Sequence, residues 1–251
     1  LSEVECRSDS QSTRLIVAPH AGYSYSAPTA AVAYKQLMLN KSSIKTVFIL
    51  GPSHFYRLKG CDLSQFDYCK TPIGDLKVNT DVNMNLIKMS KLFSYADPRK
   101  DEEEHSIEMH LPFVAKIFEG IDITVIPIIV GDFDDTSRDT ELVSALANYA
   151  EDPSTLFIIS TDFCHWGSRF DYQFYDKSHE EIYQSIEALD KRGINAIESL
   201  NPDTFQQYLI ETGNTICGRN PLILILKVIN LITSSQSNNS ALKFIAYNQS
   251  S

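Results

Sequence analysis

The sequence predicts an α/β protein in which helices flank one central sheet that is mostly parallel or mixed. Short apolar runs alternate along the chain with segments of helical spacing, which is typical of layered α/β folds. Each run is apolar at successive positions, as expected of strands covered on both faces. No Pro/Gly/Ser-rich linker, fixed-period repeat or low-complexity block divides the 251 residues. We therefore expect a single domain over residues 1–251.

Four apolar runs are the predicted strands of this sheet. They cover residues 15–18, 47–50, 123–130 and 156–159. A further stretch at 61–78, "CDLSQFDYCKTPIGDLKV", looks like a hairpin, and we expect it to add an antiparallel part to the fold.

Helical spacing or composition predicts the helices between and after these runs. The first, over 28–39, follows Ser26 as a candidate N-cap and begins at Pro28, because proline is favourable in a first turn. The remaining helices cover 82–93, 113–120, 140–150, 178–193 and 221–232. The last of these is apolar on nearly all sides, so we expect it to be buried.

The charge balance argues against several classes of partner. The chain has 22 Lys and Arg against 32 Asp and Glu, a formal net charge of −10, and it has no basic stripe. Nucleic acids and anionic membranes need clustered cations, so we expect neither as a partner. The longest apolar stretch, 221–232, contains Lys227 and is shorter than the about 20 residues that span a bilayer. The first residues show no secretory n-region and h-region pattern, so we expect no secretory leader.

Cysteine usage predicts the redox compartment. The five cysteines form no CxxC pair and are odd in number: Cys6, Cys61, Cys69, Cys164 and Cys217. In a chain of this length, that pattern favours free thiols and a cytoplasmic location.

Histidines follow three of the predicted strands. His20 comes after the first run, Ser53 and His54 after the second, and Asp162, Cys164, His165 and Trp166 after the fourth. Ligands of open α/β sheets bind outside the carboxyl ends of the strands, so three of the six histidines there indicate a site. The alternative is that each of them caps a helix or lies in a solvated loop.

Neutral imidazoles together with one anionic ligand are typical of divalent metal sites. Cys217 is a candidate for the anionic ligand, because it precedes Asn220, a possible N-cap, and the helix expected from Pro221. The helix N-terminus and the adjacent Arg219 favour a lowered pKa for the Cys217 thiol. The alternative is an inert, small core residue.

A second histidine cluster lies in "DEEEHSIEMHLPF". His105 and His110 are five positions apart and diverge by about 140° on a regular helix, so an unbroken helix cannot aim both at one metal. Pro112 favours a kink or a helix start there. We expect the acidic run 101–104 to be a solvated approach to a helix, and His105 and Glu108 to support the site without binding the metal.

Other catalytic motifs are missing from the sequence. It contains no GxSxG, GxGxxG or Walker motif, so we expect no nucleotide cofactor. Ser53 beside His54 does not make a hydrolase triad, because neighbours at a strand end rarely face each other.

Six segments together resemble the Memo family, the mediators of receptor-driven cell motility. They are "APHAGYSYS", "ILGPSHF", "EEEHSIEMHLPF", "STDFCHWGSRFDY", "EIYQSIEALDK" and "NTICGRNP", and they extend from about residue 15 to the end of the chain. The resemblance implies the LigB-like fold of class III extradiol dioxygenases, in which two histidines and a glutamate hold non-haem Fe(II).

Matching the motifs residue by residue implies a set of site residues. His20 and His54 match the two ligand histidines, and Cys217 lies at the position of the third ligand. His165 matches the pocket histidine that acts as acid and base, next to Asp162. Tyr25 and Ser53 are expected to contact a bound ligand in the same cleft.

The third ligand separates this chain from the dioxygenases. Cys217 stands where those enzymes have glutamate, and a softer thiolate favours copper or zinc and changes the chemistry of iron. We expect iron or copper as the cofactor and expect no ring cleavage. The "HAGSWY"-like opening segment and the final strand of the family have no counterpart in this sequence.

Three functions follow from this reasoning. The first is a metal-dependent redox protein in redox or cell-motility signalling. The second, implied by the animal members of the family, is an adaptor that binds a phosphotyrosine-type peptide or a signalling protein in the same cleft, although the sequence shows no usual Arg cluster. The third is a fold relic whose cleft is only structural.

Overall fold

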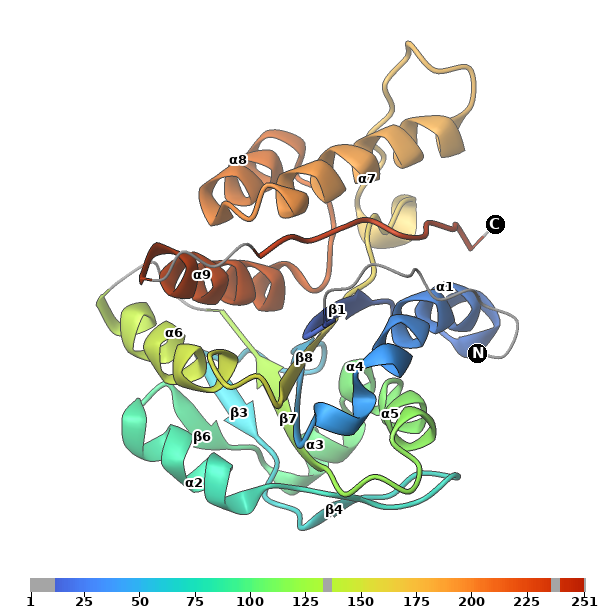
Figure 1. Ribbon diagram of the computed structural model, residues 1–251. Helices are drawn as coiled ribbons and strands as arrows, with labels where there is room; N and C mark the ends of the chain where they lie inside the picture. The colour runs from blue at the N-terminus through green and yellow to red at the C-terminus, as the bar shows by residue number, and fades with distance from the viewer. Residues whose placement is uncertain (1–11, 133–136, 236–239, 251) are drawn as a thin grey trace.

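The computed structural model describes residues 12–132, 137–235 and 240–250 of the protein (Figure 1). A six-stranded sheet lies at the centre, in the order β1–β8–β2–β7–β3–β6. Its strands are β1 (Leu15–Ala18), β2 (Thr46–Pro52), β3 (Cys61–Leu63), β6 (Phe93–Tyr95), β7 (Thr124–Val130) and β8 (Thr155–Ser160). Only the β3–β7 pair is antiparallel among these described strands. The mixed sheet and the four predicted strands are confirmed.

The segment predicted as one hairpin is divided between two sheets. Its first part, β3, joins the main sheet between β7 and β6. Its second part forms a small antiparallel pair of β4 (Tyr68–Cys69) and β5 (Leu76–Lys77). The prediction of a single hairpin was wrong for Cys61–Leu63, whose three buried residues pack in the core.

Helices cover both faces of the sheet (Figure 1). Listed in chain order, they are α1 (Tyr23–Lys35), α2 (Thr80–Met89), α3 (Pro98–Glu103), α4 (His105–Glu108), α5 (Leu111–Ile117), α6 (Ser137–Ala150), α7 (Ile182–Glu198), α8 (Pro202–Thr212) and α9 (Arg219–Ser235). Asparagine side chains start two of them: Asn79 accepts from the backbone of Val82 in α2, and Asn201 precedes Pro202 in α8.

Alternation along β2 divides the core between the two faces. Phe48 and Leu50 belong to the cluster that contains residues of α2, α6, α7, α8 and α9. Val47 and Ile49 belong to the cluster that contains residues of α1, α4 and α5. Successive side chains of a strand point to opposite faces, so apolar residues at every position require helices on both.

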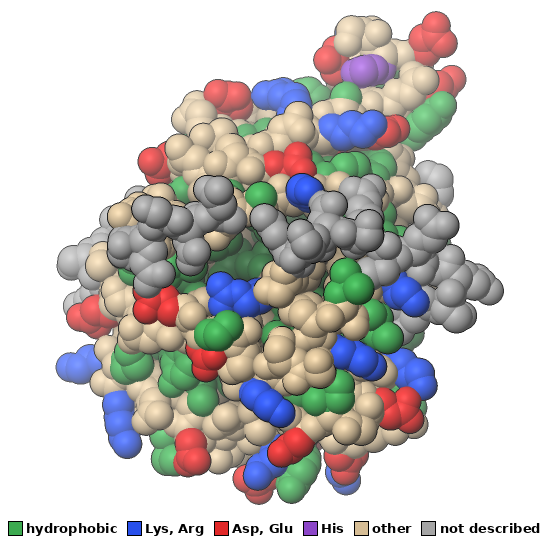
Figure 2. All heavy atoms as spheres, in the orientation of Figure 1, with side chains coloured by type: hydrophobic (Ala, Val, Ile, Leu, Met, Phe, Trp, Pro, Cys, Tyr) green, Lys and Arg blue, Asp and Glu red, His purple; other side chains and the backbone are tan. Residues whose placement is uncertain are grey.

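The predicted burial of the last helix is confirmed. Leu222, Leu224, Leu226 and Val228 of α9 are fully buried. None of the helices within the described ranges is long and apolar enough to cross a membrane. Basic and acidic side chains are interspersed on the face in Figure 2, with no basic stripe there.

The first helix begins earlier than predicted. It starts at Tyr23, with Gly22 at the N-cap, so Pro28 lies inside the helix and not at its start. Ser26 lies within the helix as well, where its hydroxyl donates to the carbonyl of Ala21 at 2.6 Å. The backbone amides of Tyr25 and Ser26 already bond to the carbonyl of Gly22, which begins the helix without a serine cap.

Candidate metal centre at the carboxyl end of the sheet

Parallel strands bring four predicted site segments to one edge of the sheet. His20 follows β1, His54 follows β2, Asp162 and His165 follow β8, and Cys217 precedes α9. One potential ligand atom from each of His20, His54 and Cys217 lies within 4.8 Å of the other two. The same limit holds for Asp162, His165 and Cys217. The structure therefore brings all five residues together, as the sequence predicts.

Cys217 lies closest to His20. Its Sγ is 3.3 Å from His20 Nε2 and accepts from the backbone N–H of Asp162 at 3.2 Å. The next residue, Gly218, packs directly on β8: an added Cβ would lie 2.3 Å from Cβ of Thr161. A glycine at this position therefore permits the start of α9 to approach the end of β8.

The protein alone does not activate the Cys217 thiol. Burial, followed by the nearby Asp162 carboxylate, raises the pKa of Cys217 to about 12. The prediction of a lowered pKa was wrong, because burial and Asp162 outweigh the opposing hydrogen bonds. Asn220 was also misplaced as an N-cap: α9 begins at Arg219, and the Asn220 amide donates to Gly131 and Asp132.

The His20 ring is 2 % exposed and has a polar neighbour at each nitrogen, Ser160 at Nδ1 and Cys217 at Nε2. Its backbone N–H donates to Asp162 Oδ1 at 3.1 Å, and its Nδ1 lies 2.7 Å from Ser160 Oγ. Burial, followed by repulsion from His54, lowers the pKa of His20 to about 3. The ring is neutral at pH 7, which is the state that a metal ligand requires.

The His54 ring is oriented by a buried glutamate. Glu104 Oε1 lies 2.9 Å from His54 Nδ1, and Oε2 accepts the backbone N–H of His54 at 2.7 Å. Glu104 was predicted to lie in a solvated acidic run, but it is 2 % exposed. Burial alone would raise the pKa of Glu104, yet the bonds from His54 and Ser106 lower it to about 2. A carboxylate on Nδ1 leaves Nε2 of the neutral ring free for a metal.

The two histidines of the second cluster occupy different parts of the site. His105 lies on α4 with its ring 4.6 Å from that of His54 and 5.5 Å from that of His20. His110 lies between α4 and α5, is 1 % exposed, and faces Ser160. The helix is broken there, so both rings reach the site. Glu108 lies on the exposed side of α4, and burial, followed by the nearby Glu108 charge, raises the pKa of Tyr23.

His165 and Asp162 lie beside Cys217 and at the mouth of a cavity. The backbone N–H of His165 donates to Thr215 Oγ1 at 2.7 Å, and its Nδ1 lies 2.9 Å from the carbonyl of Thr215. That carbonyl only accepts, so Nδ1 carries the proton of the neutral ring and Nε2 is left to accept one.

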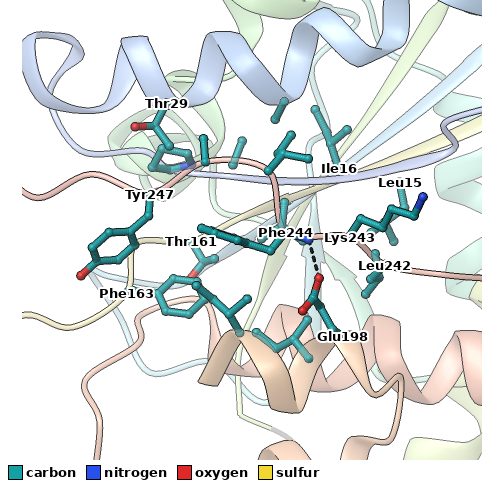
Figure 3. A pocket seen from close by; sticks show the side chains of 18 of the residues that line it. Leu15, Ile16, Thr29, Thr161, Phe163, Glu198, Leu242, Lys243, Phe244 and Tyr247 are labelled. Atoms are coloured by element: carbon teal, nitrogen blue, oxygen red, sulfur yellow. Dashed lines mark hydrogen bonds between the residues drawn. The ribbon is translucent and has the colours of Figure 1, made fainter. Parts of the chain in front are cut away.

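A cavity of about 920 Å³ extends from this edge along β1. Asp162, His165 and Tyr25 line one part of it, and Tyr25 is 56 % exposed. Figure 3 shows Leu15 and Ile16 of β1 among the residues that line this cavity, together with Leu242 and Phe244, and the backbone of Phe244 donates to Glu198. The predicted ligand residue Tyr25 is thus available to a molecule in this cavity.

A second, smaller cavity of about 380 Å³ lies on the other side of His54 and Cys217. Arg57, Arg219 and Ser53 line it. Ser53 donates its hydroxyl to the carbonyl of Tyr56 at 2.7 Å. Both arginines are exposed, and neither has a carboxylate within ion-pair distance among the described residues.

The donor set fits a metal ion. Bonds of about 2.0–2.1 Å to nitrogen and about 2.3 Å to sulfur put tetrahedral ligand atoms about 3.4–3.6 Å apart. The 3.3 Å between His20 Nε2 and Cys217 Sγ is slightly shorter than this separation, so a small outward shift of either side chain would admit the ion, and His54 lies within reach. Two imidazoles and one thiolate are soft-to-intermediate ligands that suit copper, zinc and iron rather than magnesium or calcium.

Sequence reasoning missed the residues that hold these ligands. Glu104, Ser160 and Tyr34 all contact histidines of the site or its support. Ser160 is the last residue of β8, so the rule that located His20 and His54 also points to it. For Tyr34, which lies in mid-helix, the sequence carries no such signal.

The fold and the site define a class: an α/β protein with a candidate centre of two histidines and one cysteine at the carboxyl edge of its sheet. Residues 2–251 match the family described as Memo-like protein. The chain is 45% identical to Protein MEMO1 of Homo sapiens over 255 aligned positions, which cover 100% of this chain and 83% of that protein. It is 44% identical to Protein memo-1 homolog of Caenorhabditis elegans over 94% of this chain and 67% of that protein. The chain belongs to the Memo-like family.

Proposed function

We propose that this protein binds a redox metal ion, iron or copper, through His20, His54 and Cys217. The observation that carries this proposal is the convergence of three ligand atoms, from separate segments, within 4.8 Å of one another. Following the resemblance to mediators of cell motility, we assign the metal-bound protein to redox or cell-motility signalling. Ring cleavage is not part of the proposal, because a cysteine replaces the glutamate that ring-cleaving enzymes use.

When bound, iron or copper supplies one-electron redox chemistry or polarises a bound molecule. The chain's own residues prepare the surroundings. Glu104 orients His54, and His165 holds a proton at Nε2 in its charged form, close to Asp162 and Cys217. Asp162 and His165 line the larger cavity, and His54 and Cys217 line the smaller one.

Metal content after anaerobic reconstitution tests this proposal. The wild-type protein is loaded with Fe(II) or Cu(I), desalted and measured by elemental analysis, beside His54→Ala and Cys217→Ser. We expect about one equivalent in the wild type and a large loss in both variants. His179→Ala, in the loop before α7, is the matched control and keeps the wild-type content. Wild-type protein that retains neither metal above background rejects the proposal.

A second function is supported by the arginines of the smaller cavity. Arg57 and Arg219 line it together with His54 and Ser53, and two guanidinium groups suit a phosphate. In this second function the protein is an adaptor that binds a phosphotyrosine-type peptide in the smaller cavity and catalyses no reaction.

Calorimetry with a phosphotyrosine peptide and its unphosphorylated form separates the two functions. We expect the phosphopeptide to bind at least about tenfold more tightly, and Arg57→Gln with Arg219→Gln to remove that preference. Arg99→Gln, an exposed arginine on α3, is the control. Equal weak binding of both peptides rejects phosphate recognition and leaves the metal proposal untouched.

A further inference from the structure

A chain of buried hydrogen bonds runs from α1 to the His20 ring. Tyr34 Oη lies 2.8 Å from His110 Nδ1, and His110 Nε2 lies 2.9 Å from Ser160 Oγ. Ser160 Oγ lies in turn 2.7 Å from His20 Nδ1 and 2.6 Å from the carbonyl of Ser106. Each of these side chains is at most 2 % exposed. Water therefore cannot replace any member of the chain.

The protons in this chain can be assigned from the carbonyl of Ser106. A carbonyl only accepts, so the single hydroxyl proton of Ser160 is donated to it. Ser160 Oγ is then left with its two lone pairs, and it faces two imidazole nitrogens. Both nitrogens must donate, which puts protons on His20 Nδ1 and on His110 Nε2.

The Tyr34 end of this hydrogen-bond chain is consistent with the assignment. With its proton on Nε2, the neutral His110 ring has a lone pair on Nδ1, and Tyr34 supplies the O–H that this lone pair accepts. Every donor has one acceptor in this arrangement. The other tautomer of His20 would need the Ser160 proton and would leave the buried carbonyl of Ser106 without it.

We infer that Ser160, His110 and Tyr34 are positioning residues that hold His20 in one tautomer, with its proton on Nδ1 and the Nε2 lone pair directed toward Cys217. The functional meaning of this inference rests on the proposed metal site. Nε2 of His20 is the nitrogen that lies 3.3 Å from Cys217 Sγ. The hydrogen-bond chain therefore leaves unprotonated the nitrogen that a shared metal would bind. Glu104 has the same effect on His54. Both ligand rings are thus oriented before any metal arrives.

Long-range ¹H–¹⁵N correlation spectra of the histidine rings test the tautomer directly. The full chain is labelled with ¹⁵N and treated with EDTA, and the His20 signals are identified by their loss in His20→Ala. We expect a protonated Nδ1 and an unprotonated Nε2 for His20, and the reverse for His110. A wild-type spectrum with His20 protonated on Nε2 overturns the inference. The tautomer is observed in the wild-type protein, and His20→Ala serves only to assign the signals.

Ser160→Ala tests the role of the shared acceptor. The variant removes the acceptor of two buried N–H groups, so we expect His20 to lose its single-tautomer pattern. Cu(I) affinity, measured by competition with a chromophoric chelator, should fall about 10- to 100-fold. Ser185→Ala removes an equally buried serine hydroxyl on α7, which accepts from Asp176, and should change neither result.

These experiments can reject the metal site and the His20 tautomer independently of each other. A wild-type protein that shows the expected His20 tautomer and retains no iron or copper rejects the metal site but not the tautomer. A protein that binds metal with His20 protonated on Nε2 rejects the tautomer assignment but not the metal site. Ser160→Ala with the wild-type spectrum and affinity overturns the positioning role.

Discussion

Glu104 is the residue on which the geometry of His54 depends. A carboxylate with 2 % exposure is stable only when its oxygens are paired, and Glu104 accepts from the backbone and ring of His54 and from the backbone of Ser106. These bonds keep it ionised despite its burial. The carboxylate stays next to the ring, where it accepts the Nδ1 proton and leaves Nε2 available to a metal.

Glu104→Gln should therefore weaken metal binding without removing a ligand. A glutamine lacks the charge and keeps only one accepting oxygen, so at least one N–H group that Glu104 accepts would face its NH2 group, and we expect Cu(I) affinity to fall about 10- to 100-fold. Competition titration with a chromophoric chelator measures the change. Glu103→Gln makes the same chemical change at the exposed neighbouring position and should leave the affinity intact. Equal affinity in the two variants would show that Glu104 is only structural.

At the scale of elements, two junctions build the centre. The break between α4 and α5 at His110 lets rings five positions apart enter one network, which a continuous helix would prevent. The junction of β8 with α9 is the second, where Gly218 donates its backbone N–H to Thr161 Oγ1 at 3.0 Å. At each junction, the direction in which the helix or strand starts or ends decides where its histidine or cysteine side chain lies.

Gly218→Ala should disturb this second junction. The new methyl group would collide with Thr161 and push Cys217 away from His20. We expect a loss of about 1–3 kcal/mol in the free energy of unfolding, measured by urea denaturation, together with weaker Cu(I) binding. Gly74→Ala is the matched control, since an added Cβ there has no neighbour within 4 Å among the described residues. A variant with normal stability and affinity would exclude the close approach.

At the scale of the whole molecule, the buried rings of His20 and His110 make the protein sensitive to acid. Burial, and then repulsion from a neighbouring histidine, lowers the pKa of both His20 and His110 from 6.5 to about 3. Between these values the unfolded chain binds protons that the folded chain does not, so stability is present above the unfolded pKa and is lost as the pH falls. Glu104, with its pKa lowered from 4.5 to about 2, adds to this loss only at lower pH.

We expect the free energy of unfolding of EDTA-treated protein to fall by up to about 2.7 kcal/mol per pH unit between about pH 6 and pH 4. Urea denaturation followed by circular dichroism measures this slope. His110→Gln should reduce the slope by about half, because one of the two buried rings is removed. His179→Gln should leave it unchanged. A wild-type stability that is flat across this range would contradict neutral, buried rings.

The sequence alone determined the fold class, the four central strands and the strand ends that the site histidines follow. These properties follow from local patterns, because apolar runs define parallel strands and the carboxyl ends of parallel strands share an edge. His20, His54, Asp162 and His165 could be predicted to meet for that reason, whereas Cys217 was predicted from its place before a helix and from the resemblance to the Memo family. The metal identity, the adaptor role and the likeness to ring-cleaving dioxygenases stay predictions.

Only the tertiary structure decided how those residues are held and charged. Glu104 reaches His54 across 50 positions, and Ser160 reaches His20 across 140, so no local pattern reports either contact. Burial reversed the expected pKa shift of Cys217, and backbone bonds to Gly22 moved the start of α1 ahead of Pro28. Hydrogen-bond partners and burial depend on atoms brought together by folding, whereas strand direction is already encoded in neighbouring residues.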